Sequence, residues 1–231
     1  MKTIHDDNIE TETRKILESV KKAFSWSVGK YGEHGTYVLT PKRRNKTKAG
    51  GEDDVETMLS TAYMNPILRD IVNPPSSLKM TFKSGPKVFR EGDRVVNLKN
   101  TDEVLNGEIG YIKKIEKSTA PTLTVEFEDG SEVTYTPDRL KEIDWAYALT
   151  VHKSQGCEYD SVIYPTSMTH GIMLQRNLLY TAVTRAKKSV AIIGSEQSLK
   201  AAISTVKDRA KKDLLVARVQ KYYTQNNFHS A

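Results

Sequence analysis

The feature that most constrains this chain is the segment 144–162, which reads DWAYALTVHKSQGCEYDSV. An apolar run over 145–151 ends in a polar group, 152–156, and a second apolar run begins at Val162. A buried strand, a polar loop and another buried strand are typical of an open α/β sheet, which binds ligands beyond the carboxyl ends of its strands. Taken alone, the segment is equally compatible with an ordinary surface loop, because His, Lys, Ser and Gln are common in loops.

A second segment strengthens the first interpretation. Residues 177–194 read NLLYTAVTRAKKSVAIIG, and their spacing predicts a helix over 174–186 followed by a buried strand over 189–194. Arg185 falls at the edge of the helix's apolar stripe, near its end, from where a guanidinium can emerge at a cleft. The alternative role for this arginine is structural: a salt bridge, or a hydrogen bond to the last carbonyls of the helix.

The periodicity of the remaining apolar residues predicts further elements. Helical spacing favours helices over 7–24, 55–63 and 196–220, and a short strand covers 37–40 before Pro41 stops it. After the second of these helices, three prolines predict an irregular segment.

Residues 108–136 change to a period of two, which predicts short antiparallel strands. A two-residue turn would pair Val125 with Thr134 and mix apolar and polar side chains on one face. A three-residue loop over 128–130 pairs Val125 with Val133 instead, and puts its glycine where such a loop needs a left-handed residue. We therefore predict the three-residue loop, and short strands in so small a region favour a small barrel.

Composition excludes several classes of protein. The single cysteine, Cys157, rules out an intrachain disulfide framework and a multi-cysteine zinc site, and it indicates a reducing cytoplasm. No apolar run approaches the ~20 residues of a membrane span, and residues 1–12 lack the apolar core of a signal peptide. The net charge of +6 permits a nucleic-acid partner without requiring one. No metal site is predicted.

Together the two segments resemble motifs V and VI of superfamily 1 DNA helicases, in the branch that contains the RecD-like proteins and the phage Dda helicase. YALTVHKSQGCEYDSVI is similar to motif V, and NLLYTAVTRAKKSVAIIG is similar to motif VI. The resemblance implies a RecA-like α/β domain, called 2A, with an inserted SH3-like barrel, called 2B. The implied limits are 1–106 and 142–220 for the RecA-like domain, 107–141 for the barrel, and 221–231 for a frayed tail.

The resemblance also implies roles at a nucleotide. In these helicases ATP lies between two RecA-like domains, and an arginine of motif VI, here Arg185, reaches the γ-phosphate. Gly156 and Glu158 would approach the nucleotide, with the carboxylate accepting from the ribose hydroxyls. At the end of the strand 37–40, Arg44 is the residue most similar to a further family arginine, with Arg43 as a close rival.

Other residues of motif V would contact DNA. By resemblance these contacts are to the backbone, from Thr150, His152 and Ser154. Lys153 is a candidate for a phosphate, although it could equally point into solvent. The basic run 42–48 is either a solvated loop or a phosphate contact.

The motifs that hold phosphate and magnesium are absent from the sequence. It contains no GxxxxGK[ST], and no apolar strand ends in paired acids. We therefore expect ATP and Mg²⁺ to be held mostly by a first, N-terminal RecA-like domain, and this chain to be inactive alone.

The resulting interpretation is the C-terminal part of an ATP-dependent DNA helicase. It would be a hydrolase of DNA repair or recombination, similar to the α subunit of exodeoxyribonuclease V, and its branch usually moves 5′ to 3′. Its expected partners are single-stranded DNA, the first RecA-like domain, and a protein that the barrel could dock. The alternative is a non-catalytic module that binds single-stranded DNA or docks a partner.

Overall fold

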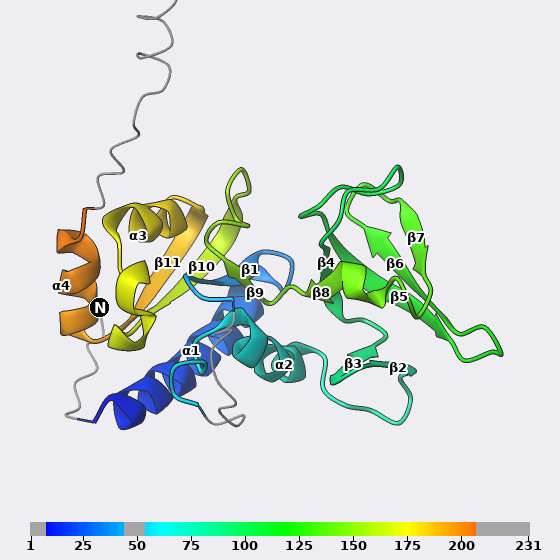
Figure 1. Cartoon of the computed structure of the whole chain (residues 1–231), viewed down its shortest axis with the longest axis horizontal. Helices are drawn as coiled ribbons and strands as arrows, with labels where there is room; N and C mark the ends of the chain where they lie inside the picture. Colours follow the sequence, from blue (N-terminus) through cyan, green and yellow to red (C-terminus); the bar gives the residue numbers. More distant parts are fainter. Residues whose placement is uncertain (1–7, 44–53, 207–231) are drawn as a thin grey trace, which may run out of the picture.

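The computed structural model describes residues 8–43 and 54–206, and one half of it is a parallel sheet flanked by helices (Figure 1). The strands are, in spatial order, β11 (Ala186–Gly194), β10 (Tyr159–Thr166), β1 (Thr36–Thr40) and β9 (Ala148–Thr150). One face is covered by α1 (Ile9–Tyr31) and α2 (Thr61–Val72), and the other by α3 (Arg176–Val183) and α4 (Glu196–Ser204). The predicted α/β class is confirmed.

Strand β1 is buried on both faces because it lies in the interior of the sheet. Val38 packs with α1 and α2, while Tyr37 and Leu39 pack with α3, and all three side chains are inaccessible or nearly so. A parallel strand with helices on both sides has this continuous apolar pattern.

Helix α1 is longer than the predicted 7–24. Asn8 caps its start by accepting a hydrogen bond from the second helical N–H at 2.8 Å, and Gly32, with φ 76°, ends it. The last turns remain helical because Ser27 still faces the sheet, where its hydroxyl lies 2.9 Å from that of Ser161.

The other half of the molecule is a five-stranded antiparallel sheet, which we call the SH3-like domain (residues 94–145; Figure 1). In spatial order its strands are β7 (Glu132–Tyr135), β6 (Thr122–Phe127), β5 (Ile109–Glu116), β4 (Arg94–Asn97) and β8 (Ile143–Trp145). A hairpin of β2 (Thr81–Ser84) and β3 (Lys87–Arg90) precedes it, and a short 3-10 helix, η1 (Leu140–Glu142), leads into β8. The sheet extends beyond the predicted insert 107–141 on both sides, because β4 pairs with β8.

The hairpin between β6 and β7 has the predicted register. Val125 lies opposite Val133, and Leu123 lies opposite Tyr135. Gly130 has φ 84° and donates its N–H to the carbonyl of Phe127 at 3.0 Å, which closes the three-residue loop. The three-residue loop is confirmed.

Besides α1, three further predicted helices are wrong in their bounds. The helix expected at 55–63 begins at Thr61, where Ser60 caps it, and it continues through Pro66, whose missing N–H releases only one carbonyl. The helix expected at 174–186 ends at Val183, and residue 186 already belongs to β11. Helix α4 ends at Ser204, and the rest of the predicted 196–220 beyond residue 206 lies outside the described residues, as does the predicted tail.

The predicted single strand over 145–151 is also wrong, because it belongs to two sheets. Strand β8 ends at Trp145 and pairs with β4, while β9 begins at Ala148 and pairs with β1. Only Ala146 and Tyr147 lie between them, so the backbone passes directly from the SH3-like domain into the parallel sheet.

Asn65 of α2 holds this passage in place. Its side-chain amide donates to the carbonyls of Trp145 and Ala148, both at 3.1 Å, and its Oδ1 accepts the N–H of Ala148 at 2.7 Å. The side chain is buried. The carbonyls of Trp145 and Ala148 and the N–H of Ala148 thereby gain hydrogen-bond partners outside the strand pairing of the two sheets.

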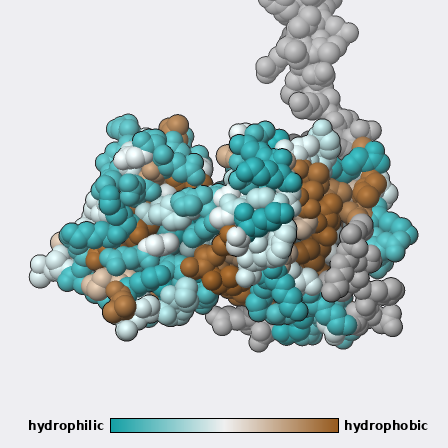
Figure 2. Space-filling view, turned by 180° about the vertical axis from the view of Figure 1, so that it is seen from behind, coloured by the Kyte–Doolittle hydropathy of each residue, from teal (hydrophilic) through white to brown (hydrophobic). Residues whose placement is uncertain are grey.

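Hydrophobic surface is concentrated on the half of the molecule that contains the parallel sheet, whereas the SH3-like half is mostly hydrophilic in the view of Figure 2. Large exposed apolar side chains of the parallel-sheet half are Ile9, Trp26, Ile172, Tyr180, Val190, Ile203 and Val206, and those of the other half are Leu78, Met80, Val88 and Leu105. Among the described residues, no helix has the length and apolarity needed to cross a membrane.

We predict that Asn65→Ala destabilises the chain by about 2–4 kcal/mol, because it leaves buried backbone donors and acceptors without partners. Urea unfolding monitored by tryptophan fluorescence measures the change. The matched control is Asn100→Ala, an exposed asparagine that accepts one N–H, from Asn106, for which we expect less than ~1 kcal/mol. Equal effects of the two substitutions would contradict the role given to Asn65.

Candidate functional site

The connection between β9 and β10, residues 151–158, runs from one end of the parallel sheet to the other. It leaves at the carboxyl end of β1, where Val151 donates its N–H to the carbonyl of Thr40 at 3.1 Å. It arrives at the amino end of β1, where Ser161 pairs with Thr36. The expectation that the whole loop lies at the carboxyl ends is therefore right only for its first part.

One group of predicted residues lies at the carboxyl ends of β1 and β9. Thr150 is the last residue of β9, His152 is exposed, and Lys153 is half-buried. Burial lowers the pKa of Lys153, the positive charge of Arg43 lowers it further, and Asp144 opposes the shift. Neither Lys153 nor Arg43 has a salt bridge to a carboxylate among the residues that the structure describes. Two cations that form no salt bridge within the described chain thus lie near enough to repel each other.

Ser154 does not share this exposure. Its side chain is fully buried, and its hydroxyl donates to the carbonyl of Val151 at 2.8 Å. Its own carbonyl accepts the N–H of Cys157 at 3.1 Å, across a turn in which Gly156 has φ 88°. In this conformation Ser154 shapes the loop rather than presenting its hydroxyl to a ligand.

A second group lies at the amino ends of β10 and β11. Arg185 follows α3 instead of ending it, and its carbonyl accepts the N–H of Tyr159 at 2.8 Å. Its guanidinium donates from Nη1 to the carbonyl of Cys157 at 3.1 Å, and from Nε to the carbonyl of Thr181 at 3.3 Å. The second bond is the helix-end contact that was the structural alternative for this arginine. The first bond joins motif VI to motif V.

Glu158 and Gly156 are open at this same end. The carboxylate of Glu158 is 3.7 Å from the ammonium of Lys187, and both side chains are more than half exposed. Gly156 is exposed, and no atom lies within 4 Å of the position of a Cβ there. An exposed ion pair of this kind contributes little to stability, so a ligand can replace it.

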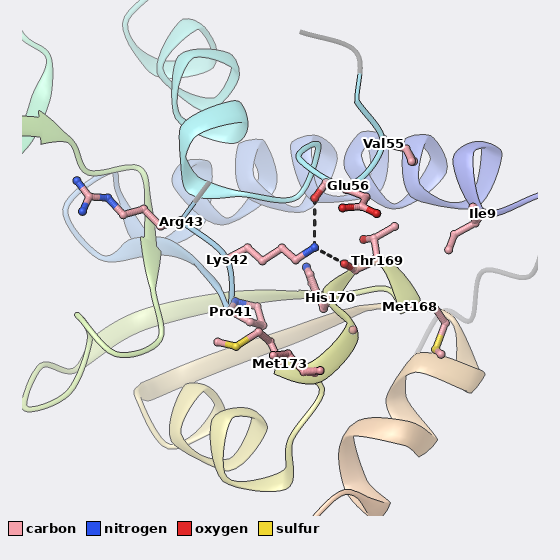
Figure 3. Close-up of a pocket in the computed structure, with 12 residues that line it drawn as sticks. Ile9, Pro41, Lys42, Arg43, Val55, Glu56, Met168, Thr169, His170 and Met173 are labelled. Atoms are coloured by element: carbon pink, nitrogen blue, oxygen red, sulfur yellow. Dashed lines mark hydrogen bonds between the residues drawn. The ribbon is translucent and has the colours of Figure 1, made fainter. Parts of the chain in front are cut away.

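The sequence favoured Arg44 over its neighbour Arg43 as the further arginine that approaches the nucleotide. Arg44 lies outside the described residues. Lys42 does not behave as part of a solvated loop, since its ammonium donates to the carbonyls of Thr169 and Glu56 (Figure 3). These bonds close one side of an open pocket of about 660 Å³ at the carboxyl ends of β1 and β10. Burial lowers the pKa of Lys42.

His170 in this pocket was not identified from the sequence. It lies in the 3-10 helix η2 (Met168–Met173) after β10, and Figure 3 shows its ring next to the end of Lys42. Neither ring nitrogen has a hydrogen-bond partner among the described residues. Burial, helped by Lys42, lowers its pKa to about 3, so the imidazole is neutral near neutral pH. Only its position after a predicted strand could have drawn attention to it.

Two family models match the chain. The UvrD-like helicase C-terminal domain matches residues 145–193, which include the whole β9–β10 connection and Arg185 but not Arg43. The ATP-dependent RecD-like DNA helicase SH3 domain matches residues 64–127, which overlap the antiparallel sheet.

Similar proteins agree with these models. An ATP-dependent RecD2 DNA helicase from Deinococcus radiodurans is 37% identical over 82% of this chain, which spans 24% of that protein's length. The RecBCD enzyme subunit RecD from Mycobacterium tuberculosis is 47% identical over 29% of this chain, or 12% of its own length. The crystal structure of a Pif1 helicase from Bacteroides with ADP-AlF3 and single-stranded DNA has the same fold, with a TM-score of 0.50 and 16% identity, covering 95% of this chain and 54% of that one.

We predict that Ser154→Ala lowers the stability of the chain more than His152→Ala does, although both residues lie in one loop. Ser154→Ala should cost about 1–2 kcal/mol, because the buried carbonyl of Val151 loses its donor. His152→Ala should change stability by less than ~0.5 kcal/mol, as expected for an exposed side chain. Thermal melting of the two variants measures both. A larger loss at His152 than at Ser154 would mean that the loop is packed differently.

Proposed function

We propose that the chain forms the second RecA-like part of an ATP-dependent DNA helicase of the RecD-like kind, because it matches the models of a UvrD-like helicase C-terminal domain and of a RecD-like DNA helicase SH3 domain, and is similar to a RecD2 DNA helicase. The observation that carries the proposal is the β9–β10 connection, which has an acidic and arginine-containing group at one end and a cationic group at the other. A phosphate loop and magnesium ligands would come from a first RecA-like domain. The chain spans 24% of the length of the Deinococcus radiodurans relative, which leaves room for such a domain in the rest of a protein of that kind.

The nucleotide would meet the amino-end group. Arginine has five N–H donors, and Arg185 uses one each from Nε, Nη1 and Nη2 among the described residues, so each terminal nitrogen keeps one N–H for a γ-phosphate oxygen. Glu158 would accept from the ribose hydroxyls, and Gly156 would allow the close approach of a phosphate or sugar. When bound, ATP with Mg²⁺ supplies the phosphoryl group and the metal charge, and Arg185 would stabilise the charge that develops on transfer.

Single-stranded DNA would meet the carboxyl-end group. Lys153 and Arg43 are two cations without a carboxylate partner in the described chain, and a phosphate between them would relieve their repulsion. Thr150 and His152 flank this position and can donate to backbone oxygens. Contacts of this type position the strand without reading its bases. Arg44 remains a rival to Arg43 for the nucleotide.

The two ends would be coupled by the connection itself. Residues 151–158 contain no helix or strand, so a displacement at His152 is transmitted over a few backbone units to Glu158. Hydrolysis at one end could thus move the strand held at the other. Polarity would be 5′ to 3′ by analogy with the branch, and the site of action would be cytoplasmic, in DNA repair or recombination.

Two protein contacts complete the proposal. The exposed apolar residues of the parallel-sheet half would meet the first RecA-like domain. The SH3-like half would dock a protein partner through the hairpin region, where Leu78, Met80 and Val88 are exposed. The similar protein from Mycobacterium tuberculosis is a subunit of the RecBCD enzyme, which is why a protein partner is proposed for this chain as well.

We predict that Arg185→Ala lowers ATP turnover by roughly 10³–10⁵ when this region is joined to a Walker-containing RecA-like domain. DNA binding should persist, and stability should change by at most ~1 kcal/mol. Steady-state ATPase and thermal melting on one preparation measure both. The control is Arg176→Ala at the other end of α3, which should leave turnover near normal. A lower melting temperature with near-normal turnover for Arg185→Ala would assign it a helix-end role only.

We also predict that the isolated chain binds single-stranded DNA weakly and without sequence preference, with no ATPase activity. Raising salt from ~50 to ~200 mM should weaken binding, and Lys153→Ala should reduce the salt slope by about 1, because one phosphate contact is lost. Fluorescence anisotropy at several salt concentrations measures the slope. Lys22→Ala, on the exposed side of α1, should leave it unchanged. Strong, salt-independent binding would favour a DNA-binding module instead.

A further inference from the structure

Arg94 is among the largest fully buried side chains in the described chain, although it carries a charge. It is the first residue of β4, in the SH3-like domain. Its guanidinium nonetheless donates to carbonyls at the start of the parallel sheet, from Nη2 to Thr36 at 3.1 Å and from Nη1 to Glu33. These two bonds tie the halves of the molecule together and offset part of the cost of burying the charge, although Nε has no hydrogen-bond partner among the described residues.

The guanidinium also lies between two aromatic rings. Its carbon is 4.1 Å from the ring centre of Tyr37 and 4.9 Å from that of Tyr147. Burial raises the pKa of Tyr37 and of Tyr147, so both remain neutral phenols. The contacts are therefore cation–π interactions, which are strongest when desolvated.

The stack continues from Tyr37 to the nucleotide end of the β9–β10 connection. The ring of Tyr37 lies 4.1 Å from that of Tyr159, with 32° between their planes. Tyr159 directly follows Glu158, and its N–H donates to the carbonyl of Arg185 at 2.8 Å. A continuous series of contacts thus joins a strand of the SH3-like domain to both residues proposed to meet ATP.

We propose that Arg94 is a positioning residue through which the SH3-like domain sets the placement of Glu158 and Arg185, by way of Tyr37 and Tyr159. Its consequence for ATP hydrolysis rests on the proposed function, whereas the mechanical coupling does not. A load or partner on the SH3-like domain would shift Arg94 and, through the stack, the nucleotide end of the connection. The guanidinium of Arg94 is fully buried, so it acts on the nucleotide end only through other residues.

Cys157 provides a probe of that end without any engineering. It is the single cysteine of the chain, it is exposed, and its carbonyl accepts from Arg185. The rate at which an aromatic disulfide reagent modifies this thiol under native conditions reports the order of the loop. The whole 231-residue chain is used, with neither nucleotide nor DNA.

Arg94→Lys retains the charge but loses the planar stack, and Tyr159→Leu breaks the second step while leaving Arg94 in place. Each should raise the modification rate of Cys157 by roughly three- to tenfold, the effect expected from losing a desolvated cation–π or aromatic contact. The matched control is Arg139→Lys, whose guanidinium lies 5.1 Å from the ring of Tyr135 within the SH3-like domain. It should leave the rate unchanged.

Two measurements distinguish a change in the loop from a general loss of stability. One is the modification rate of Val133→Ala, a truncation in the core of the SH3-like domain outside the stack, and the other is the urea midpoint of every variant. If Val133→Ala lowers the midpoint without raising the rate, a general loss of stability does not explain the effect. Folded Arg94→Lys and Tyr159→Leu with wild-type rates would overturn the proposal. Because the side chain of Tyr159 also interacts with the thiol of Cys157, Tyr159→Leu does not decide alone. If Arg94→Lys does not fold, Tyr147→Leu, which removes one of the two rings beside the guanidinium, takes its place. If Arg94→Lys and Tyr159→Leu raise the modification rate of Cys157 while Arg185→Ala leaves ATPase activity normal, the coupling is retained and the proposed function is rejected.

Discussion

The structure depends on the direct passage of the backbone from β8 to β9. With only Ala146 and Tyr147 between two sheets, the orientation of the SH3-like domain is set by a few torsion angles and by the groups that fix them. Asn65 supplies three hydrogen bonds from α2 to this passage, and Tyr147 accepts the N–H of Arg94 through its hydroxyl at 3.0 Å. Because buried backbone groups must be paired, the passage has few alternative conformations, and motif V begins from a fixed point.

From that fixed point the connection has little freedom. It must cover the length of β1 in the residues 151–158, so its two ends are separated by the height of the sheet. Ser154 shapes its turn internally, and Arg185 holds its far end through the carbonyl of Cys157. A connection that is restrained at both ends and built of hydrogen-bonded turns between them is suited to relate events at two ligands, because neither end can move independently of the other.

Local patterns were enough to predict some of this arrangement. The register of β6 and β7 follows from side-chain alternation and from the need for a glycine at residue 130, both of which operate within one hairpin. The break at Ala146 was not predictable, because 145–149 is apolar throughout and only pairing with distant strands divides it. Arg185 leaves the helix although no breaker precedes it, since residue 186 pairs with Tyr159. Tertiary pairing overrides local propensity at these positions.

Arg94 was the least predictable, because an arginine at the start of a strand is normally exposed. Its burial raises the question of why an apolar residue does not occupy the site. Replacing a buried charge by a well-packed apolar side chain is often neutral for stability, but here it would leave the carbonyls of Thr36 and Glu33 without these donors. An apolar side chain could also pack against Tyr37 and Tyr147 in several orientations. A planar guanidinium with fixed donor directions fits between the two rings in only a few orientations. The arginine therefore contributes a defined geometry between the two halves of the molecule, which is what a positioning role requires.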